Sequence, residues 1–309
     1  MLRHEVVTTV RSDEKGQFLV DSHKGKKLSY VIVKDIAQEG AFDEAVKSDP
    51  PFEAVLHTAS PFHFNATDPK KDLMDPAIIG TTGILKAIKA SAPSVKRVAI
   101  TSSFAAIVNA HNHKKVYNED VWNPVTMEEA MKDPATAYRG SKTFAEKAAW
   151  EFVEKENPNF SLSTINPPFV FGPVVHYLNS LESTNTSNQR ILSIMQGKMK
   201  EKVPPTGTWI WVDVRDVALA HIRAIELPEA AGKRFFVTAG YVTNKDMIDI
   251  IREEFPDLRS QLPENAESDL PKDVYQIDNS RSIRVLGLKY RSLRECVVDT
   301  VKSLKAVGA

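Results

Sequence analysis

The feature that most constrains the fold is an alternation, repeated along the chain, of short apolar runs with longer helical patterns. Runs typical of buried strands cover 5–10, 29–33, 54–62, 96–104 and 160–165, and patterns typical of helices cover 73–91 and 143–152. Such alternation is characteristic of a parallel sheet with helices on its faces. We therefore predict an α/β fold with a Rossmann-type doubly wound parallel sheet.

The strand and helix patterns also predict two domains. Residues 1–166 carry most of the alternation and form the predicted nucleotide-binding domain. Residues 167–309 form mainly a smaller substrate-binding lobe, and the segments around 209–220 and 234–242 are expected to return to the sheet. A chain of 309 residues is long enough for a large core of this kind.

Charge and composition narrow the class of protein. The chain has 40 Lys and Arg and 40 Asp and Glu residues, a formal net charge of zero, which argues against nucleic acid or an anionic membrane as partner. A single cysteine, Cys296, excludes an internal disulfide and a thiolate zinc site. No run has the length of a transmembrane helix or the form of a signal peptide. We expect a cytoplasmic protein without a metal, either a monomer or a homodimer.

Tyr138 and Lys142 stand four residues apart, just before the helix-forming run 143–152. On a helix this spacing places both side chains on one face, one turn apart. A nearby ammonium stabilises a phenolate, so Lys142 would lower the pKa of Tyr138 toward working pH. The pair predicts a general acid for a carbonyl oxygen that is being reduced. An exposed helical pair without chemistry has the same spacing.

Ser102 and Ser103 stand at the carboxyl end of the strand pattern that begins at Lys96. In open α/β sheets, ligands bind outside the carboxyl ends of the strands. A serine hydroxyl at this edge can hydrogen-bond a substrate carbonyl and share its polarisation with the tyrosine. Either serine is therefore a candidate for the site.

Two basic residues follow the strand pattern that ends at Val10. Arg11 is the first residue of the predicted exit loop 11–15, and Lys15 is the last. In a dinucleotide-binding sheet, a carboxylate after the second strand takes the ribose 2′-hydroxyl, whereas a basic residue suits a 2′-phosphate. The loop therefore favours NADP(H), with a solvated loop of mixed charge as the alternative.

The strand pattern 54–62 ends in small residues at 58–60, which would let the backbone approach a cofactor closely. Phe62, beyond them, indicates either an apolar pocket wall or ordinary core. His57 is interpreted as a structural strand residue, because no second histidine or carboxylate stands at metal-ligand spacing.

Later segments carry mostly structural signals. Prolines and a glycine predict an irregular loop at 166–173, and the polar stretch 174–188 predicts a mobile substrate loop. Short strand patterns cover 209–212 and 234–238. Helix N-terminal signals stand at Asp213, at Thr243 with Asp246, and at Ser292 with Glu295.

Taken together, these segments resemble the extended short-chain dehydrogenases/reductases. The resemblance is strongest to the NADPH-dependent methylglyoxal/isovaleraldehyde reductases, the fungal-type carbonyl reductases grouped with dihydroflavonol and cinnamoyl-CoA reductases. The matching segments are 10–12, 56–62, 101–103, Tyr138 with 140–142, 144–152, 166–167 with 170–173, and 212–218. Each is short, but they stand in the right order over much of the chain.

The resemblance implies hydride transfer from NADPH to an aldehyde or ketone. It assigns the catalytic roles to Ser103, with Ser102 as the alternative, and to Tyr138 and Lys142. It assigns cofactor contacts to Arg11, Lys15, Asp35, Ile36, Thr58, Ala59, Ser60, Tyr138, Lys142, Pro167 and Val170. It assigns the substrate pocket to Phe62, Phe104, Phe169 and Tyr177. These aromatics favour apolar carbonyl compounds over sugars, and a dihydroflavonol-4-reductase-like or epimerase/dehydratase-type activity stays open.

The sequence departs from that family before Arg11. The fold calls for a first strand, a glycine-rich turn and a first helix there, yet the first glycine of the sequence is Gly16. The first strand is central in the order 3-2-1-4-5-6, so its omission would leave two neighbouring strands unpaired or force them together. We interpret the sequence as an N-terminally truncated form of an active reductase. The alternative is a homologue impaired in cofactor binding.

Overall fold

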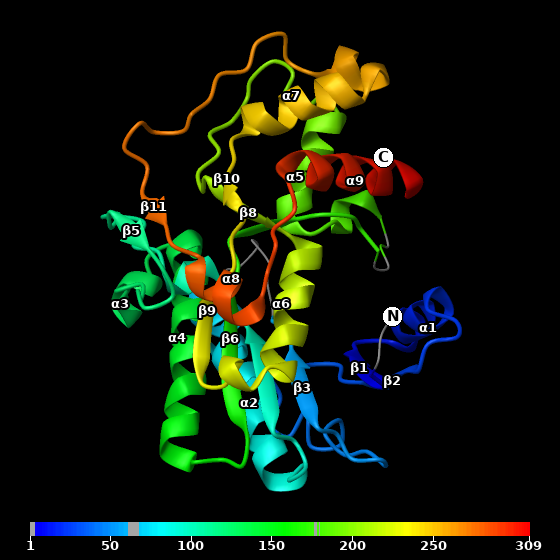
Figure 1. Cartoon of the computed structure of the whole chain (residues 1–309), viewed down its shortest axis with the longest axis vertical. Coiled ribbons are helices and arrows are strands. Elements are labelled where there is room, and N and C mark those ends of the chain that lie inside the picture. The colour runs from blue at the N-terminus through cyan, green and yellow to red at the C-terminus, as the bar shows by residue number, and fades with distance from the viewer. Residues whose placement is uncertain (1–3, 61–67, 176–177, 179) are drawn as a thin grey trace. The chain divides into compact units, whose positions relative to one another are not determined.

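The structure, a computed structural model of the chain, describes residues 4–60, 68–175, 178 and 180–309 (Figure 1). The chain divides into two compact units. Unit 1 comprises Met1–Asn112, Asp120–Asn166 and Ala224–Arg234, and unit 2 comprises His113–Glu119, Pro167–Arg223 and Phe235–Ala309. The later segment that joins unit 1 is 224–234, whereas the sequence predicts returning segments around 209–220 and 234–242.

Unit 1 has the alternating strands and helices that the apolar periodicity predicts. In chain order its elements are β1 (Val6–Val10), α1 (Asp13–Ser22), β2 (Leu28–Ile32), β3 (Ala54–His57), α2 (Asp75–Ser91), β4 (Arg97–Thr101), α3 (Met127–Ala130), α4 (Pro134–Glu156) and β6 (Ser161–Asn166). A π-helical turn, Lys70–Met74, leads into α2. The end of α6 (Val214–Glu226) and the start of β9 (Lys233–Phe236) also belong to this unit.

A four-stranded sheet in the order β3-β4-β6-β9 forms the centre of the fold. The ladders between β3 and β4 and between β4 and β6 are parallel. Helices α2 and α4 pack against each other, and their apolar faces share one core with β4 and β6 (Figure 1). Its buried members include Ile84, Leu85, Ile88, Val98, Ile100, Ala149 and Leu162. The carboxyl ends of β3, β4 and β6 consequently lie along one edge of the sheet.

The parallel sheet of unit 1 is interrupted between β1 and β3. Strands β1 and β2 pair in parallel with each other as a separate two-stranded sheet, and in the described part of the chain neither pairs with β3. Strand β3 is consequently an edge strand of the four-stranded sheet. Apolar side chains remain exposed on these strands: Leu56 of β3 is 41% accessible and Ile32 of β2 is 43% accessible.

The segment after β1 differs from the predicted exit loop 11–15. Helix α1 begins at Asp13, so Lys15 lies in the first helical turn and only Arg11 and Ser12 connect strand and helix. Gly16 of this helix is buried against Tyr30 of β2, and a Cβ atom at Gly16 would lie 2.4 Å from the Tyr30 ring. The absence of a side chain at Gly16 is therefore what lets α1 approach β2.

Unit 2 is built from short strands and from helices that share a core. Its elements are β5 (Val116–Tyr117), β7 (Phe169–Phe171), α5 (Thr186–Met195), β8 (Ile210–Asp213), most of α6, β10 (Gly240–Tyr241), α7 (Asn244–Glu254), β11 (Gln276–Ile277), α8 (Ser280–Leu286) and α9 (Leu293–Ala306). Strands β10, β8 and β7 form one sheet, and β5 pairs with β11. Apolar side chains of α5, α7 and α9 meet in the core, among them Ile191, Leu192, Met247, Ile251, Val297 and Val301.

Two segments predicted to be irregular are partly regular. Within 166–173 the structure has strand β7, which pairs in parallel with β8. Within 174–188 a short 3-10 helix, Leu181–Ser183, precedes the first turn of α5. Asn188 of α5 holds the loop end, since its side-chain amide donates to the Gly172 carbonyl at 2.8 Å.

The helix caps follow the sequence signals closely. The Asp213 carboxylate accepts from the Arg215 backbone N–H at 2.8 Å, as an N-cap of α6 would. Thr243 and Asp246 form the full capping box of α7. At α9 the Ser292 hydroxyl caps the Glu295 N–H, whereas the Glu295 side chain pairs with arginine.

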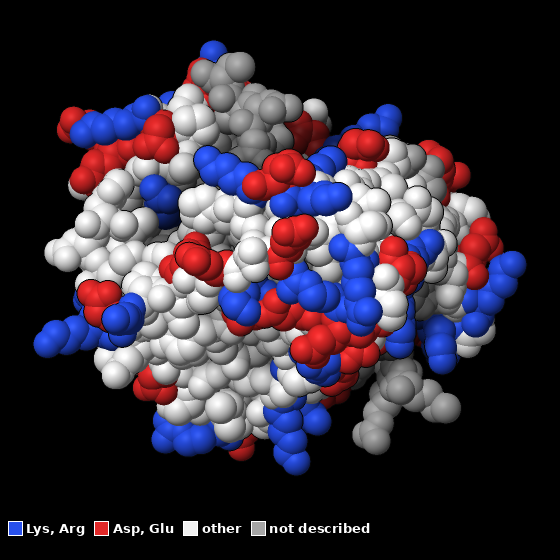
Figure 2. Space-filling view, turned by 90° about the horizontal axis from the view of Figure 1, so that it is seen from above, with Lys and Arg blue, Asp and Glu red and all other residues white. Residues whose placement is uncertain are grey.

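Surface charge and hydropathy agree with the composition. Lys and Arg side chains are interspersed with Asp and Glu over the face seen in Figure 2, in keeping with the net charge of zero. Of the helices in the described ranges, none is long and apolar enough to cross a membrane.

Candidate active site

Helix α4 carries the tyrosine and the lysine of the YxxxK motif. The Asp133 carboxylate caps its N-terminus, accepting from the Thr136 N–H at 2.9 Å. Tyr138 and Lys142 follow one turn apart, and both side chains are half-buried. The ammonium of Lys142 lies 6.0 Å from the centre of the Tyr138 ring. The spacing therefore places the two groups on one face, as predicted.

Gly140, between them, sets how closely α4 approaches its neighbour. A Cβ atom at Gly140 would lie 2.5 Å from the Cβ of Ala130 in helix α3. Any side chain at this position would push α4 away from α3. The glycine of the motif is thus a packing residue that fixes the helix carrying Tyr138.

The structure brings Ser103, rather than Ser102, to the tyrosine. Strand β4 ends at Thr101, and Ser103 begins a short 3-10 helix by accepting a hydrogen bond from the Ala105 N–H at 3.1 Å. The Ser103 side chain is also hydrogen-bonded to Tyr138. The Ser102 hydroxyl faces the other way and donates to the carboxylate of Glu146 at 2.5 Å.

The pKa of Tyr138 differs in direction from the expectation. Burial raises the pKa of Tyr138 above its usual value, and the hydrogen bond from Ser103 lowers it only in part. The expected lowering by Lys142 is therefore wrong for this structure. The reason is burial, which also lowers the pKa of Lys142 to about 8 because it disfavours the ammonium. Tyr138 accordingly keeps its proton at neutral pH.

Lys142 reaches the end of strand β3. Its ammonium donates to the Ser60 hydroxyl at 2.7 Å. A small cavity of about 10 Å³, enough for roughly one water molecule, lies beside this contact. Its lining combines Ala59 and Ser60 with Ser102, Lys142 and Glu146. Ser60, predicted from the sequence to contact cofactor, is thus brought to Lys142.

The predicted 2′-phosphate residues lie at the edge of the β1–β2 sheet. Arg11 and Lys15 are both exposed, and within the described part of the chain neither forms an ion pair. The Ser12 side chain, at the N-cap of α1, caps no backbone N–H. Asp13 is occupied by the Tyr30 hydroxyl, which donates to it at 2.6 Å. Two uncommitted cations beside a helix N-terminus fit a phosphate group.

The other predicted cofactor contacts in unit 1 are more dispersed. Asp35 forms a turn, because its carboxylate accepts from the Ala37 N–H at 2.9 Å. Ile36 packs toward helix α2, where a Cβ atom at Gly80 would lie 3.1 Å from it. Thr58 is exposed and Ala59 is half-buried at the end of β3.

The remaining predicted residues divide between unit 2 and undescribed positions. Pro167 and Val170 belong to unit 2, where the Val170 N–H donates to the Ser187 hydroxyl at 3.2 Å. Of the predicted pocket residues, Phe104 is buried in unit 1 and Phe169 lies in β7 of unit 2, with the Arg190 guanidinium 5.1 Å from its ring centre. Phe62 and Tyr177 lie outside the described residues.

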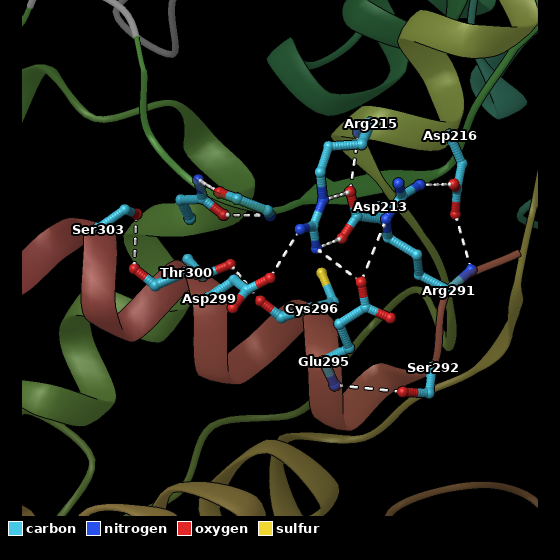
Figure 3. Close-up of polar contacts among 12 residues, drawn as sticks. Asp213, Arg215, Asp216, Arg291, Ser292, Glu295, Cys296, Asp299, Thr300 and Ser303 are labelled. Carbon is cyan, nitrogen blue, oxygen red and sulfur yellow. Dashed lines mark hydrogen bonds and ion pairs between the residues drawn. The ribbon is translucent and has the colours of Figure 1, made fainter.

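Unit 2 has its own polar network at the start of helix α6 (Figure 3). The Arg215 guanidinium donates to the buried Asp213 at 2.7 Å and to Asp299 of α9 at 2.6 Å. Asp216 accepts from both the backbone and the side chain of Arg291. Burial raises the pKa of the neighbouring Cys296 thiol, so this cysteine stays protonated and unreactive within the core. The network ties β8 and α6 to α9 and offers no reactive group.

One buried residue next to Tyr138 and Lys142 was not among the predicted site residues. Glu146 stands four residues after Lys142, on the same face of α4, and is 2% accessible. An acidic residue on the buried face of a helix is rare unless it is paired, and this was the available signal.

Comparison with known proteins places this geometry in a family. A family profile described as "NAD dependent epimerase/dehydratase family" matches residues 2–238. The chain is 50% identical over 306 residues to a ketoreductase (azaE) of Aspergillus niger, with 97% of this chain and 90% of that protein covered. It is 42% identical to a putative NADPH-dependent methylglyoxal reductase of Candida albicans, over 97% of this chain and 91% of that protein.

Solved structures agree with the sequence matches. The crystal structure of Gre2 from Candida albicans in complex with NADPH superposes with a TM-score of 0.92 at 40% identity, covering 99% of this chain and 93% of that one. The predicted Rossmann-type α/β fold is confirmed by this likeness. The chain therefore belongs to the NAD-dependent epimerase/dehydratase family, within the extended short-chain dehydrogenases/reductases.

Proposed function

We propose that the chain reduces aldehydes and ketones to alcohols with NADPH, at a site formed by Ser103, Tyr138 and Lys142. The observation that carries this proposal is the hydrogen bond between Ser103 and Tyr138, with the Lys142 ammonium one turn along the same helix. A serine hydroxyl and a tyrosine phenol side by side can hold one carbonyl oxygen between them.

Each group has a distinct part in the reaction. Tyr138 donates its phenolic proton to the oxygen as the carbonyl becomes an alkoxide, and its raised pKa keeps that proton available at neutral pH. Ser103 orients the carbonyl through a hydrogen bond. Lys142, with a pKa lowered to about 8, stands ready to stabilise the phenolate that remains.

NADPH, when bound, supplies the hydride. Arg11 and Lys15 would hold its 2′-phosphate, since both are exposed and unpaired among the described residues at the β1 exit. Ser60 and Lys142 would contact the sugar nearest the reacting ring. We further propose that Pro167 and Val170 border the nicotinamide, and that unit 1 is the nucleotide-binding domain and unit 2 mainly the substrate lobe.

The substrate class follows from the aromatic side chains and from the relatives. The aromatic residues that the resemblance assigns to substrate, Phe62, Phe104, Phe169 and Tyr177, suit small aliphatic or aromatic carbonyl compounds. Relatives named as methylglyoxal reductases and as a ketoreductase support the same class. A cytoplasmic location remains a prediction from the sequence.

The test is the rate of NADPH consumption with methylglyoxal and with 3-methylbutanal. Tyr138→Phe removes only the phenolic hydroxyl, and we expect it to lower kcat by at least roughly a hundredfold, the lower end of the range for loss of a general acid, while NADPH still binds. Tyr241→Phe, a hydroxyl of unit 2 that donates to the Tyr275 carbonyl, is the control and should retain its activity. Equal activity of wild type and Tyr138→Phe would refute the proposed site.

A further inference from the structure

Glu146 is the most heavily hydrogen-bonded carboxylate around the candidate site. One of its oxygens accepts from the Ser102 hydroxyl at 2.5 Å and from the Asn166 amide at 2.7 Å. The other accepts from the Thr164 hydroxyl at 2.7 Å and from Nε of Arg234 at 2.7 Å. Ser102 directly follows β4, Thr164 and Asn166 lie in β6, and Arg234 lies in β9. A single side chain of α4 is therefore bonded to groups on or next to three neighbouring strands.

The cation that balances this carboxylate is itself held in place. The Arg234 side chain is about as buried as its partner, at 9% against 1% accessible. Its guanidinium lies 3.6 Å from the centre of the Trp122 ring and donates to the Val121 carbonyl at 2.9 Å. A buried ion pair of this kind contributes little net stability compared with apolar replacements, because both charges are desolvated. We therefore ask which neighbouring groups the ion pair holds in place.

The neighbours that it holds include both sides of the catalytic serine. Ser102, bonded directly to Glu146, is the residue before Ser103. On the other side, the Asn166 amide donates both to Glu146 and to the Ser103 carbonyl, the latter at 3.3 Å. Tyr138, two helical turns before Glu146, is carried by the same helix. Glu146 therefore links the backbone of Ser103 to the helix that holds Tyr138.

We propose that Glu146 is a positioning residue of the reaction, which sets the Ser103 hydroxyl against the Tyr138 phenol through Ser102 and Asn166. The inference rests on the proposed function for its kinetic consequences. Glu146 is bonded to Ser102 and Asn166 and not to the substrate carbonyl, so it would act on the substrate only through the position of Ser103.

A definite electrostatic consequence follows. The hydrogen bond from Ser103 lowers the pKa of Tyr138, because it favours the phenolate. If Ser103 moves away, the pKa of Tyr138 rises further. In alcohol oxidation with NADP⁺ the phenolate is the base, so the rising limb of kcat against pH would move to higher pH. Simple loss of folded protein would lower kcat equally at every pH and leave the limb in place.

The first variant is Glu146→Gln, which keeps the shape of the side chain and removes the charge and one acceptor. Glu154→Gln is the matched control, because Glu154 is on the same helix and exposed. We expect Glu146→Gln to lower kcat for carbonyl reduction about tenfold or more, as small displacements of reacting groups do. KM for NADPH should change less than kcat. The rising limb of kcat against pH in alcohol oxidation should move to higher pH by roughly half a unit. Glu154→Gln should match the wild type.

A second variant removes both charges at once. Glu146→Leu combined with Arg234→Met leaves no unpaired buried charge, so the protein should lose less stability than a variant that keeps only one of the two charges. It still lacks the acceptor for Ser102 and Asn166, and we expect the same lowered kcat and displaced limb. A folded double variant with wild-type kcat and an unshifted pH limb would overturn the positioning role.

The third readout does not depend on turnover. In protein labelled with ¹³Cζ-tyrosine, the Tyr138 signal, assigned with Tyr138→Phe, should move in Glu146→Gln in the direction that it moves in Ser103→Ala. A wild type without NADPH-dependent activity would refute the proposed function and leave this test in force. A Tyr138 signal and a pH limb unchanged in Glu146→Gln would refute the inference.

Discussion

At the scale of single residues, the site depends on a balance between burial and hydrogen bonding. Burial raises the pKa of Tyr138 and favours its protonated form, whereas the hydrogen bond from Ser103 lowers that pKa. The spacing of Tyr138 and Lys142 in the sequence predicted that they share a helix face, which the structure confirms. It could not predict the direction of the pKa change. Spacing identifies neighbours, whereas desolvation depends on how the whole fold covers them.

A second buried titratable group, His57, offers a test of the fold. His57 is 5% accessible and lies edge-on to the Phe42 ring, and among the described residues its Nε2 atom has no hydrogen-bond partner. Burial, with a smaller effect of the Lys142 charge, lowers the pKa of His57 to about 4. Between pH 6.5 and pH 4, His57 is therefore protonated in the unfolded chain but stays neutral in the folded chain. The free energy of unfolding consequently decreases as the pH falls through this range.

We expect the free energy of unfolding of the wild type, compared with His57→Leu, to fall by about 2 kcal/mol between pH 7.5 and pH 5, from the pKa difference. Urea unfolding at the two pH values measures it. The exposed His111→Leu is the control and should follow the wild type. A wild type and a His57→Leu variant with parallel pH curves would show that His57 titrates normally.

At the scale of elements, most of unit 1 could be predicted from periodicity, and the caps of α6 and α7 from short motifs. Strand β7 and helix α5 could not. Strand β7 is short and exists because β8 pairs with it, and the start of α5 is polar, with Asn188 bonded to Gly172. Both depend on partners that lie elsewhere in the chain, which local composition does not reveal.

The β1–α1–β2 element carries the proposed phosphate residues, and its packing rests on Gly16. Gly16→Ala would place a methyl group 2.4 Å from the Tyr30 ring, a clash worth about 1–3 kcal/mol. Because the element forms its own sheet, it can open locally. We expect amide hydrogen exchange over 13–22 to accelerate about 5- to 150-fold, the factor that corresponds to this energy.

The matched control for this element is Gly83→Ala, on helix α2. A Cβ atom there would meet Phe42 at an ordinary 3.9 Å, so the substitution should leave exchange in α1 unchanged and favour the helix slightly. Unchanged exchange in Gly16→Ala would mean that α1 does not depend on close approach to Tyr30.

At the scale of the whole molecule, the fold class, the family and the reductase resemblance could be predicted from the order of short motifs. The comparisons with known proteins bear out all three. The contacts that stabilise the site were harder to foresee. Glu146 and Arg234 are 88 residues apart in sequence, and only the sheet order brings α4 and β9 together.

The most direct measurement is binding of NADPH and NADH to the 309-residue chain and to Arg11→Ala, by titration of cofactor fluorescence. We expect NADPH to bind more tightly than NADH, and Arg11→Ala to weaken NADPH by roughly tenfold or more, the loss of one charge-assisted phosphate contact, with little change for NADH. No preference for NADPH, or equal weakening of both cofactors by Arg11→Ala, would contradict an NADPH-dependent reductase with its 2′-phosphate at the end of β1.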